Sequence, residues 1–175
     1  TQGVSSAASD VYKRQFATEG LRVSIVRYFN SYGPHLDEKG YGSVIANFIR
    51  QARDGDPLTV HGDGLQTRCF TFVADTVRGT ILAGTKDEAL GSVFNIGSNF
   101  EISIADLARL ILDKTKSSSA ITNVSYEQRY GTSFEDTRRR VPSLDRARDV
   151  LGYSPTVDLA EGLDRTLAWW NTVHT

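Results

Sequence analysis

The chain has 175 residues, enough for one domain with a hydrophobic core, and its formal net charge is −1 at pH 7. This balance gives no electrostatic basis for binding nucleic acid or an anionic membrane surface, and no apolar run approaches the ~20 residues that span a bilayer. The single cysteine, Cys69, cannot form an internal disulfide, which suits a reducing compartment, so we expect a cytoplasmic protein. Since the chain contains no methionine, we expect a processed product or a fragment.

Residues 1–15 differ in character from the rest of the chain. They are mostly small and polar, with little apolar periodicity. We interpret them as a non-native or disordered tail that resembles a translated adapter sequence, and a native flexible terminus is the alternative. Phe16 to Gly20 is typical of a helix end, with Gly20 as the residue that closes it.

Residues 21–30 are predicted to form a strand, because the segment alternates and is rich in β-branched side chains. Gly33-Pro34 can turn the chain but cannot continue a ladder of hydrogen bonds, so the strand ends there. It therefore brings Tyr28, Phe29 and Asn30 to the carboxyl end of a sheet, the edge at which open α/β sheets bind ligands.

The middle of the chain alternates between predicted helices and strands. Ser43 is predicted to cap an amphipathic helix that Gly55 ends, and a short strand over 57–62 precedes a turn over 62–64. A second helix begins near Val73, where we expect Asp75 to cap it.

The later segments continue the alternation. Residues 93–97 form an apolar run typical of a strand buried on both faces of a parallel sheet. Ser103 and Asp158 each precede an acidic residue by three positions, the spacing of a helix capping box.

Two runs resemble motifs of one family. They are Arg27-Tyr28-Phe29-Asn30-Ser31-Tyr32-Gly33-Pro34 and Gln66-Thr67-Arg68-Cys69-Phe70-Thr71-Phe72-Val73-Ala74-Asp75. Both are similar to segments of the extended short-chain dehydrogenase/reductases, which include sugar-nucleotide epimerases, 4,6-dehydratases and decarboxylases. The resemblance implies an α/β fold, namely the C-terminal fragment of a Rossmann-type doubly wound sheet plus a small mixed α/β substrate-binding domain. Residues 16–34 and about 70–97 would belong to the NAD-binding part, and 35–69 and 98–175 mostly to the sugar-nucleotide-binding part.

The resemblance also implies roles for individual residues. Phe29 would lie against the nicotinamide of NAD, with Tyr28 as a second cofactor contact. Arg68 would clamp the diphosphate, a task that suits a planar guanidinium with paired donors. The expected contacts to the sugar nucleotide are Asn30, Ser43, Val44, Thr59, His61, Arg68, Asp136 and Arg139.

Some of these expectations have open alternatives. His61 would border the nucleobase or be an ordinary surface histidine, and nothing pairs it at metal-ligand spacing, so we expect no metal site. Asp136 would accept hydrogen bonds from ribose hydroxyls. One arginine of the 138–140 run would meet phosphate, and we choose Arg139; the alternative is a solvated basic face.

The catalytic signature of the family is not found in the sequence. Tyr12 is followed directly by Lys13, and no tyrosine has a lysine four places on. The segment 40–42 lacks the third glycine of a dinucleotide-binding loop, so the Gly-rich phosphate loop is also expected to lie outside this chain. We therefore expect this chain alone to be inactive, and the intact protein to be an NAD-dependent epimerase/dehydratase similar to UDP-glucose 4-epimerase.

Other functions stay open at this point. A nucleotide-sugar decarboxylase or 4,6-dehydratase of the same family is one alternative. A non-catalytic module that binds a sugar nucleotide, or a structural fragment without a ligand, would belong to another class. The expected partner is a UDP- or dTDP-linked sugar, and the intact enzyme is expected to be a homodimer.

Overall fold

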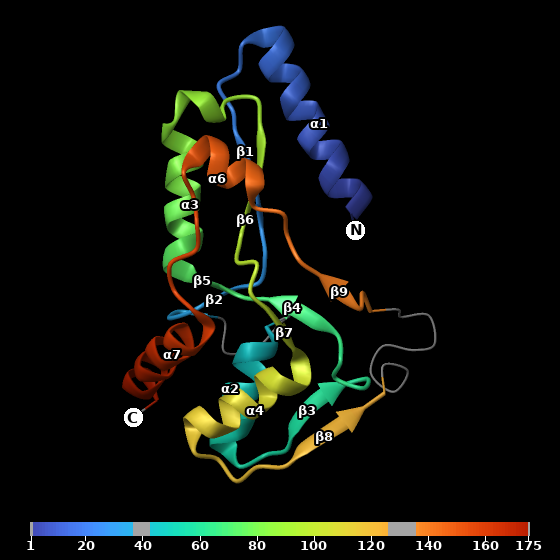
Figure 1. Cartoon of the computed structure of the whole chain (residues 1–175), viewed down its shortest axis with the longest axis vertical. Helices are drawn as coiled ribbons and strands as arrows, with labels where there is room; N and C mark the ends of the chain where they lie inside the picture. Colours follow the sequence, from blue (N-terminus) through green and yellow to red (C-terminus); the bar gives the residue numbers. More distant parts are fainter. Residues whose placement is uncertain (1, 37–42, 126–135, 175) are drawn as a thin grey trace.

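The computed structural model describes residues 2–36, 43–125 and 136–174, and for residues 2–9 only the backbone. The chain has a mixed α/β fold, as the sequence predicts (Figure 1). Its helices are α1 (Gln2–Glu19), α2 (Val44–Asp54), α3 (Val73–Thr85), the short 3₁₀ helix η1 (Asp87–Ala89), α4 (Ile104–Thr115), α6 (Asp145–Leu151) and α7 (Leu159–Val173). Its strands are β1 (Ile25–Tyr28), β2 (Ser31–Tyr32), β3 (Leu58–His61), β4 (Thr67–Cys69), β5 (Thr71–Phe72), β6 (Val93–Ile96), β7 (Glu101–Ser103), β8 (Ile121–Val124) and β9 (Arg139–Arg140).

One part of the molecule is built on the parallel pair β1 and β6, with α3 and α6 packed beside it (Figure 1). Strand β6 buries Val93 on one face and Phe94 and Ile96 on the other, which is the pattern of a parallel strand covered on both sides. Its core, which we call the β6 core, contains the buried residues Ala83, Ala89, Phe94, Ile96, Ala147, Leu151 and Tyr153.

The other part is organised around α2, α4 and α7, below β1 and β6 in the view of Figure 1. Strands β3 and β8 form a parallel pair at its side, and β4 lies between β7 and β9. The core of this part, the α2–α4–α7 core, buries Phe48, Ile49, Leu107, Ile111, Leu163 and Trp170 together with Tyr32 and Phe72. Strands β2 and β5 run side by side where the two parts meet.

Several predicted helix ends are confirmed by their hydrogen bonds. The Ser43 hydroxyl accepts from the backbone N–H of Ala46 at 3.3 Å, and the Ser103 hydroxyl accepts from Asp106 at 3.0 Å. The Asp158 carboxylate caps α7 in the same way, at 2.8 Å. Gly55 ends α2 with φ at +76°, a conformation that glycine adopts at little cost.

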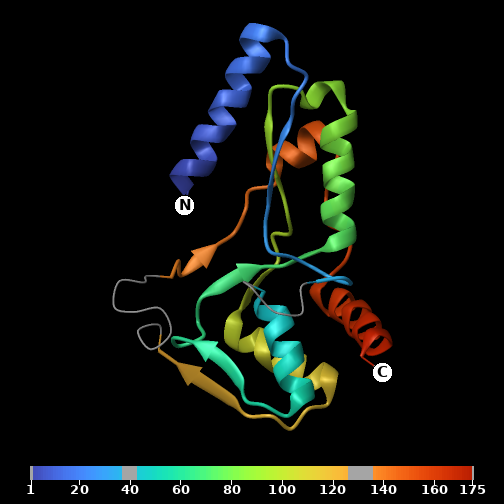
Figure 2. The ribbon, with the colours of Figure 1, turned by 180° about the vertical axis from the view of Figure 1, so that it is seen from behind.

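The N-terminal segment differs from expectation. Where we expected a disordered tail over 1–15, the chain is helical from Gln2 to Glu19, and Gly20 ends this helix with φ at +68°. Phe16 anchors the helix, because its ring lies directly against Gly91. In both views α1 stands apart from α3, across β1 and β6 (Figures 1 and 2). The non-native origin of the segment stays a prediction.

The expected strand over 21–30 is shorter in the structure and is followed by a bend. Regular pairing covers Ile25–Tyr28, and Phe29 adds one further hydrogen bond, to the Ile96 carbonyl at 3.1 Å. Asn30 then takes a positive φ of +38°, which redirects the chain into β2. Asparagine tolerates this left-handed region better than most residues.

The prediction that Asp75 caps α3 is wrong. The N-cap position is Phe72, and no side chain caps the helix there. Asp75 is instead almost fully buried and points at the segment that joins α6 to α7, where it accepts from the backbone N–H groups of Thr156 and Val157 at 2.9 and 3.0 Å. The side chain therefore joins distant segments of the chain.

One segment after residue 98 packs with the first part of the chain. Helix α6 and the buried Tyr153 belong to the β6 core, within the range 98–175 that is expected to belong mostly to the substrate-binding part. After α6 and Tyr153 the chain returns to the α2–α4–α7 core through the segment 154–158, which Asp75 holds. None of the helices in the described part of the chain is long and apolar enough to cross a membrane.

Candidate functional site

The bend after β1 places Asn30 at the junction of several strands. Its side-chain amide donates to the carbonyl oxygen of Cys69, at 2.8 Å, and its side-chain oxygen accepts from the Arg140 guanidinium at 3.0 Å. The Asn30 carbonyl accepts from the backbone N–H of Thr71 at 3.1 Å. Asn30 therefore connects the carboxyl end of β1 to both β4 and β9.

Arg68 occupies the middle strand of the β7–β4–β9 sheet, and its side chain is only 10% exposed. Its Nη1 donates to the carbonyl oxygens of Thr67 and Thr137, both at 2.7 Å. Its Nη2 donates to Asp136 Oδ1 at 2.6 Å. A buried charge is tolerated when it is paired and hydrogen-bonded in this way, and these contacts fix the direction of the guanidinium.

The register of β9 decides which arginine of the 138–140 run accompanies Arg68. Arg140 lies opposite Arg68 and Arg139 lies opposite Thr67. Because side chains alternate along a strand, Arg140 shares the face of Arg68, while Arg139 lies on the other face. The structure thus joins Arg68 to Asp136 and Asn30 to Arg140 on neighbouring strands, and Arg140 is a residue that the sequence analysis did not single out. The role of these residues as ligand contacts stays a prediction.

Arg139 forms an ion pair away from this group. Its guanidinium donates to both carboxylate oxygens of Glu101, with Nε and Nη2 each 3.0 Å from one oxygen. The Thr67 hydroxyl also donates to this carboxylate, and the hydroxyl and the guanidinium together hold the pKa of Glu101 below its ordinary value. Arg139 therefore contacts a carboxylate of its own chain on the face opposite Arg68.

The structure separates the two expected cofactor contacts. The Tyr28 hydroxyl lies 3.0 Å from the hydroxyl of Thr80 on α3, and the side chain is half exposed. Phe29 lies instead against Gly97, where an added Cβ would come within 3.0 Å of the Phe29 Cβ. Only Phe29 of the two is thus next to the loop that follows β6.

The remaining predicted contacts lie on α2 and β3, below β4 in Figure 1. Ser43 and Val44 begin α2, and the Ser43 hydroxyl caps its own helix. Thr59 is bound to α2 through Gln51, whose side-chain oxygen accepts from its backbone N–H at 3.1 Å. His61 is the last residue of β3, beside Val124 of β8. Their role as ligand contacts stays a prediction.

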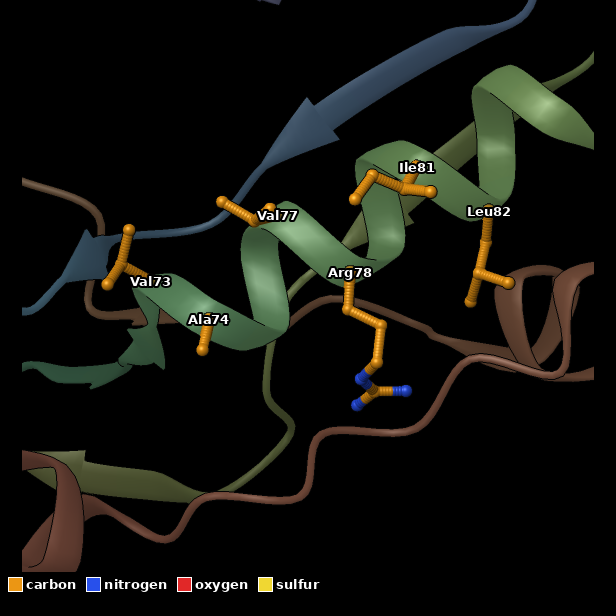
Figure 3. Close-up of a pocket in the computed structure, with 6 residues that line it drawn as sticks. All are labelled: Val73, Ala74, Val77, Arg78, Ile81 and Leu82. Atoms are coloured by element: carbon orange, nitrogen blue, oxygen red, sulfur yellow. The ribbon is translucent and has the colours of Figure 1, made fainter.

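A separate apolar depression of about 380 Å³ runs along α3 (Figure 3). It is lined by Val73, Ala74, Val77, Arg78, Ile81 and Leu82. Its single charged group, Arg78, is already bound to Asp75 at 2.7 Å. Binding sites for polar ligands combine an apolar wall with free polar groups, so this depression does not match a sugar-nucleotide site. Within the described ranges, no group of three or more acidic, histidine or cysteine side chains is placed to hold a metal ion.

Comparisons with known proteins identify relatives of this chain. The family model for GDP-mannose 4,6 dehydratase matches residues 3–166. A UDP-N-acetyl-alpha-D-glucosaminuronate decarboxylase of Bacillus cytotoxicus is 42% identical over 159 residues, which cover 91% of this chain and 49% of the relative. The chain thus spans about half the length of this curated relative.

Two solved structures extend the comparison. UDP-glucose 4-epimerase of Thermotoga maritima with UDP-glucose matches with a TM-score of 0.87 and 27% identity, over 97% of this chain and 52% of that chain. UDP-glucuronic acid 4-epimerase of Bacillus cereus, in complex with UDP-glucuronic acid and NAD, matches with a TM-score of 0.79 and 28% identity, over 91% and 48%. The architecture of this chain is therefore that of about half of such a molecule.

Proposed function

Because the chain belongs to the GDP-mannose 4,6 dehydratase family, we propose that it is the sugar-nucleotide-binding part of an NAD-dependent enzyme that modifies nucleotide sugars. The observation that carries the proposal is Arg68, a buried guanidinium held by two carbonyl oxygens and directed along Nη2 toward Asp136. A charge in this setting interacts with an anion more strongly than it would in water.

The proposed diphosphate clamp consists of Arg68 and Arg140. These two guanidiniums and Asp136 together carry one net positive charge, which favours an anionic ligand. The side-chain oxygen of Asn30 holds Arg140 in place at 3.0 Å, and Asn30 itself lies at the carboxyl end of β1. In open α/β sheets this end of the strands is where ligands bind.

We favour decarboxylation of a UDP-linked uronate as the reaction of the intact protein. The support is the 42% identity to a decarboxylase, higher than the 27–28% identity to the two epimerases. A uronate adds a carboxylate to the diphosphate, and a site with two arginines suits a ligand with more than one anionic group. Epimerisation is the second candidate, because both matched structures are epimerases with UDP-sugar ligands.

The described residues fit NAD in part. Phe29 lies between the end of β1 and the loop after β6, next to Gly97, whose missing side chain leaves room for the ring. Bound NAD would supply hydride transfer, and Phe29 would present an apolar surface to its nicotinamide ring. The Gly-rich phosphate loop and the catalytic Tyr-x-x-x-Lys would come from the rest of the intact protein. We further propose that the intact enzyme is a cytoplasmic homodimer.

The test is the binding of UDP-glucuronic acid by titration calorimetry, with wild type compared with Arg68→Ala. Loss of one charge-assisted contact should weaken binding by about 1.5–3 kcal/mol, which is roughly 10- to 150-fold in the dissociation constant. Arg109→Ala is the matched control. It removes the same charge from α4, where Arg109 forms an exposed ion pair with Asp106. An unchanged dissociation constant for Arg68→Ala would refute the assignment.

A further inference from the structure

One buried hydroxyl lies where the ladder between β1 and β6 ends. Thr71 is the first residue of β5, and it is 1% exposed. Its hydroxyl donates to the Phe29 carbonyl at 2.8 Å and accepts from the backbone N–H of Ser98 at 2.9 Å. If the parallel pairing of β1 with β6 continued by one residue, the Ser98 N–H would donate directly to the Phe29 carbonyl. The hydroxyl therefore lies between two groups that would otherwise bind each other.

Thr71 also holds both peptide groups that flank the Cα atom of Asn30. On one side its hydroxyl binds the Phe29 carbonyl, and on the other its backbone N–H donates to the Asn30 carbonyl at 3.1 Å. Between these two hydrogen bonds Asn30 adopts a φ of +38°, a left-handed conformation that asparagine tolerates but that still costs free energy. Such a conformation persists where the surrounding structure holds it, and Thr71 holds it from both sides.

The direction of the Asn30 side chain depends on this bend. Its Nδ2 donates to the Cys69 carbonyl at 2.8 Å, and its Oδ1 accepts from Arg140 Nη2 at 3.0 Å. Because a carbonyl oxygen can only accept and a guanidinium can only donate, the amide satisfies both partners in one orientation. A change in the backbone at Asn30 would therefore move the acceptor that holds Arg140.

We propose that Thr71 is a positioning residue for the diphosphate clamp and that it acts through Asn30 on Arg140. The inference rests on the proposed function and deepens it. Thr71 is buried, so it acts on a ligand only through the residues around it. Its hydroxyl fixes the peptide group that enters the bend, the bend directs the Asn30 amide, and the amide holds the Arg140 guanidinium. A guanidinium that is held before the ligand arrives loses less freedom on binding.

The experiment measures the dissociation constant of UDP-glucuronic acid by titration calorimetry for wild type, Thr71→Val and Thr71→Ser. Valine keeps the backbone N–H but removes both hydrogen bonds of the hydroxyl, so we expect binding to become about five- to tenfold weaker. Serine keeps the hydroxyl and should restore binding to within about twofold of wild type.

Thr166→Val is the matched control. Thr166 is 0% exposed, and its hydroxyl donates to the Gly162 carbonyl at 2.6 Å within α7. The substitution therefore removes a buried threonine hydroxyl from another part of the molecule. We expect it to lower the unfolding midpoint but to leave the dissociation constant unchanged.

A double variant distinguishes positioning from a general loosening of the fold. If Thr71 acts through Arg140, Thr71→Val should have little further effect once Arg140→Ala has removed the guanidinium. The double variant should then bind UDP-glucuronic acid within about twofold of Arg140→Ala alone. If the losses of the two single variants multiply instead, Thr71 does not act through Arg140 and the inference is overturned.

The outcomes separate this inference from the proposed function. If Arg68→Ala weakens binding but Thr71→Val does not, the inference is overturned and the proposed function stands. If Arg68→Ala has no effect, the proposed function itself is overturned. Circular dichroism and the unfolding midpoint establish that each variant is folded. If Thr71→Val does not fold, Thr71→Cys takes its place in both comparisons, because a thiol donates and accepts only weakly.

Discussion

Replacement of Asp75 by asparagine tests whether one buried carboxylate holds the two parts of the molecule together. The residue is 1% exposed, and its side chain receives hydrogen bonds from the segment between α6 and α7 and from Arg78 on α3. Oδ2 accepts from the backbone N–H groups of Thr156 and Val157, at 2.9 and 3.0 Å. Oδ1 accepts from the Thr156 hydroxyl at 2.8 Å and from Arg78 Nη2 at 2.7 Å. Both oxygens act purely as acceptors.

The magnitude follows from this arrangement. An asparagine has almost the same shape, but its NH₂ group cannot accept. At the Oδ2 position it would face the backbone N–H groups of Thr156 and Val157, and at the Oδ1 position it would face the Arg78 guanidinium, where only the Thr156 hydroxyl could turn to accept from it. Each buried donor left without a partner costs about 1–3 kcal/mol, and disruption of a buried ion pair costs a similar amount. We expect Asp75→Asn to lower the free energy of unfolding by about 3 kcal/mol. For a chain of this size, that loss lowers the melting temperature by roughly 6–12 °C.

The assay is urea unfolding followed by the fluorescence of Trp169 and Trp170 on α7, the helix that the Asp75 segment leads into. Asp113→Asn, an exposed carboxylate paired with Lys116, serves as the reference and should change stability by less than about 0.5 kcal/mol. A loss below about 1 kcal/mol for Asp75→Asn would refute the view that this carboxylate joins the two parts.

The pH dependence gives the same prediction an independent readout. Burial alone would raise the pKa of Asp75, but the hydrogen bonds from Arg78, Val157 and Thr156 outweigh it and hold the pKa below its ordinary value. A carboxyl with a lowered pKa in the folded state stabilises the fold above its unfolded pKa of about 3.9, and this contribution is lost as the pH falls. The stability difference between wild type and Asp75→Asn should therefore be full at pH 7 and shrink below about pH 4.

Three further substitutions test the packing around β6. Gly79→Ala should destabilise the chain by about 1–3 kcal/mol, because the new Cβ would lie 2.5 Å from Ile96 Cγ2. Gly84→Ala lies in the same helix, and its new Cβ would meet nothing within 4 Å. This substitution should therefore stabilise the chain by up to about 1 kcal/mol. The melting temperatures of both variants test this prediction. If both substitutions raise the melting temperature, or both lower it, the packing of Gly79 against Ile96 is contradicted. Tyr153→Phe should cost about 1 kcal/mol, because it removes the 2.8 Å hydrogen bond from the buried hydroxyl to the Gly97 carbonyl. Burial raises the pKa of Tyr153 to about 12, whereas an unfolded tyrosine loses its proton near pH 10. Above about pH 10 the free energy of unfolding of wild type should therefore decrease by more than that of the phenylalanine variant.

The sequence predicts local structure well where a single residue type decides it. Ser43, Ser103 and Asp158 cap their helices because a short polar side chain reaches the backbone N–H three residues later, and this needs no partner from elsewhere in the chain. Asp75 lies at an equally plausible capping position, but its oxygens accept from Thr156 and Val157, which come 81 and 82 positions later in the sequence. A local rule cannot anticipate this contact, because only tertiary packing brings α3 and the segment after α6 together.

The choice between Arg139 and Arg140 shows the same limit at the candidate site. The two neighbouring arginines are chemically identical, and a shift of one residue in the pairing of β9 with β4 would exchange their faces. From the sequence we chose Arg139 as the contact to phosphate, because the residue types alone do not distinguish the two. In the structure Arg140 lies opposite Arg68 and donates to Asn30, while Arg139 is bound to Glu101 on the other face, so the register supports our proposal of Arg140. A diphosphate at Arg68 would consequently meet Arg140. The face of β9 on which each arginine lies, rather than the mere presence of arginine, would set the chemistry of the site.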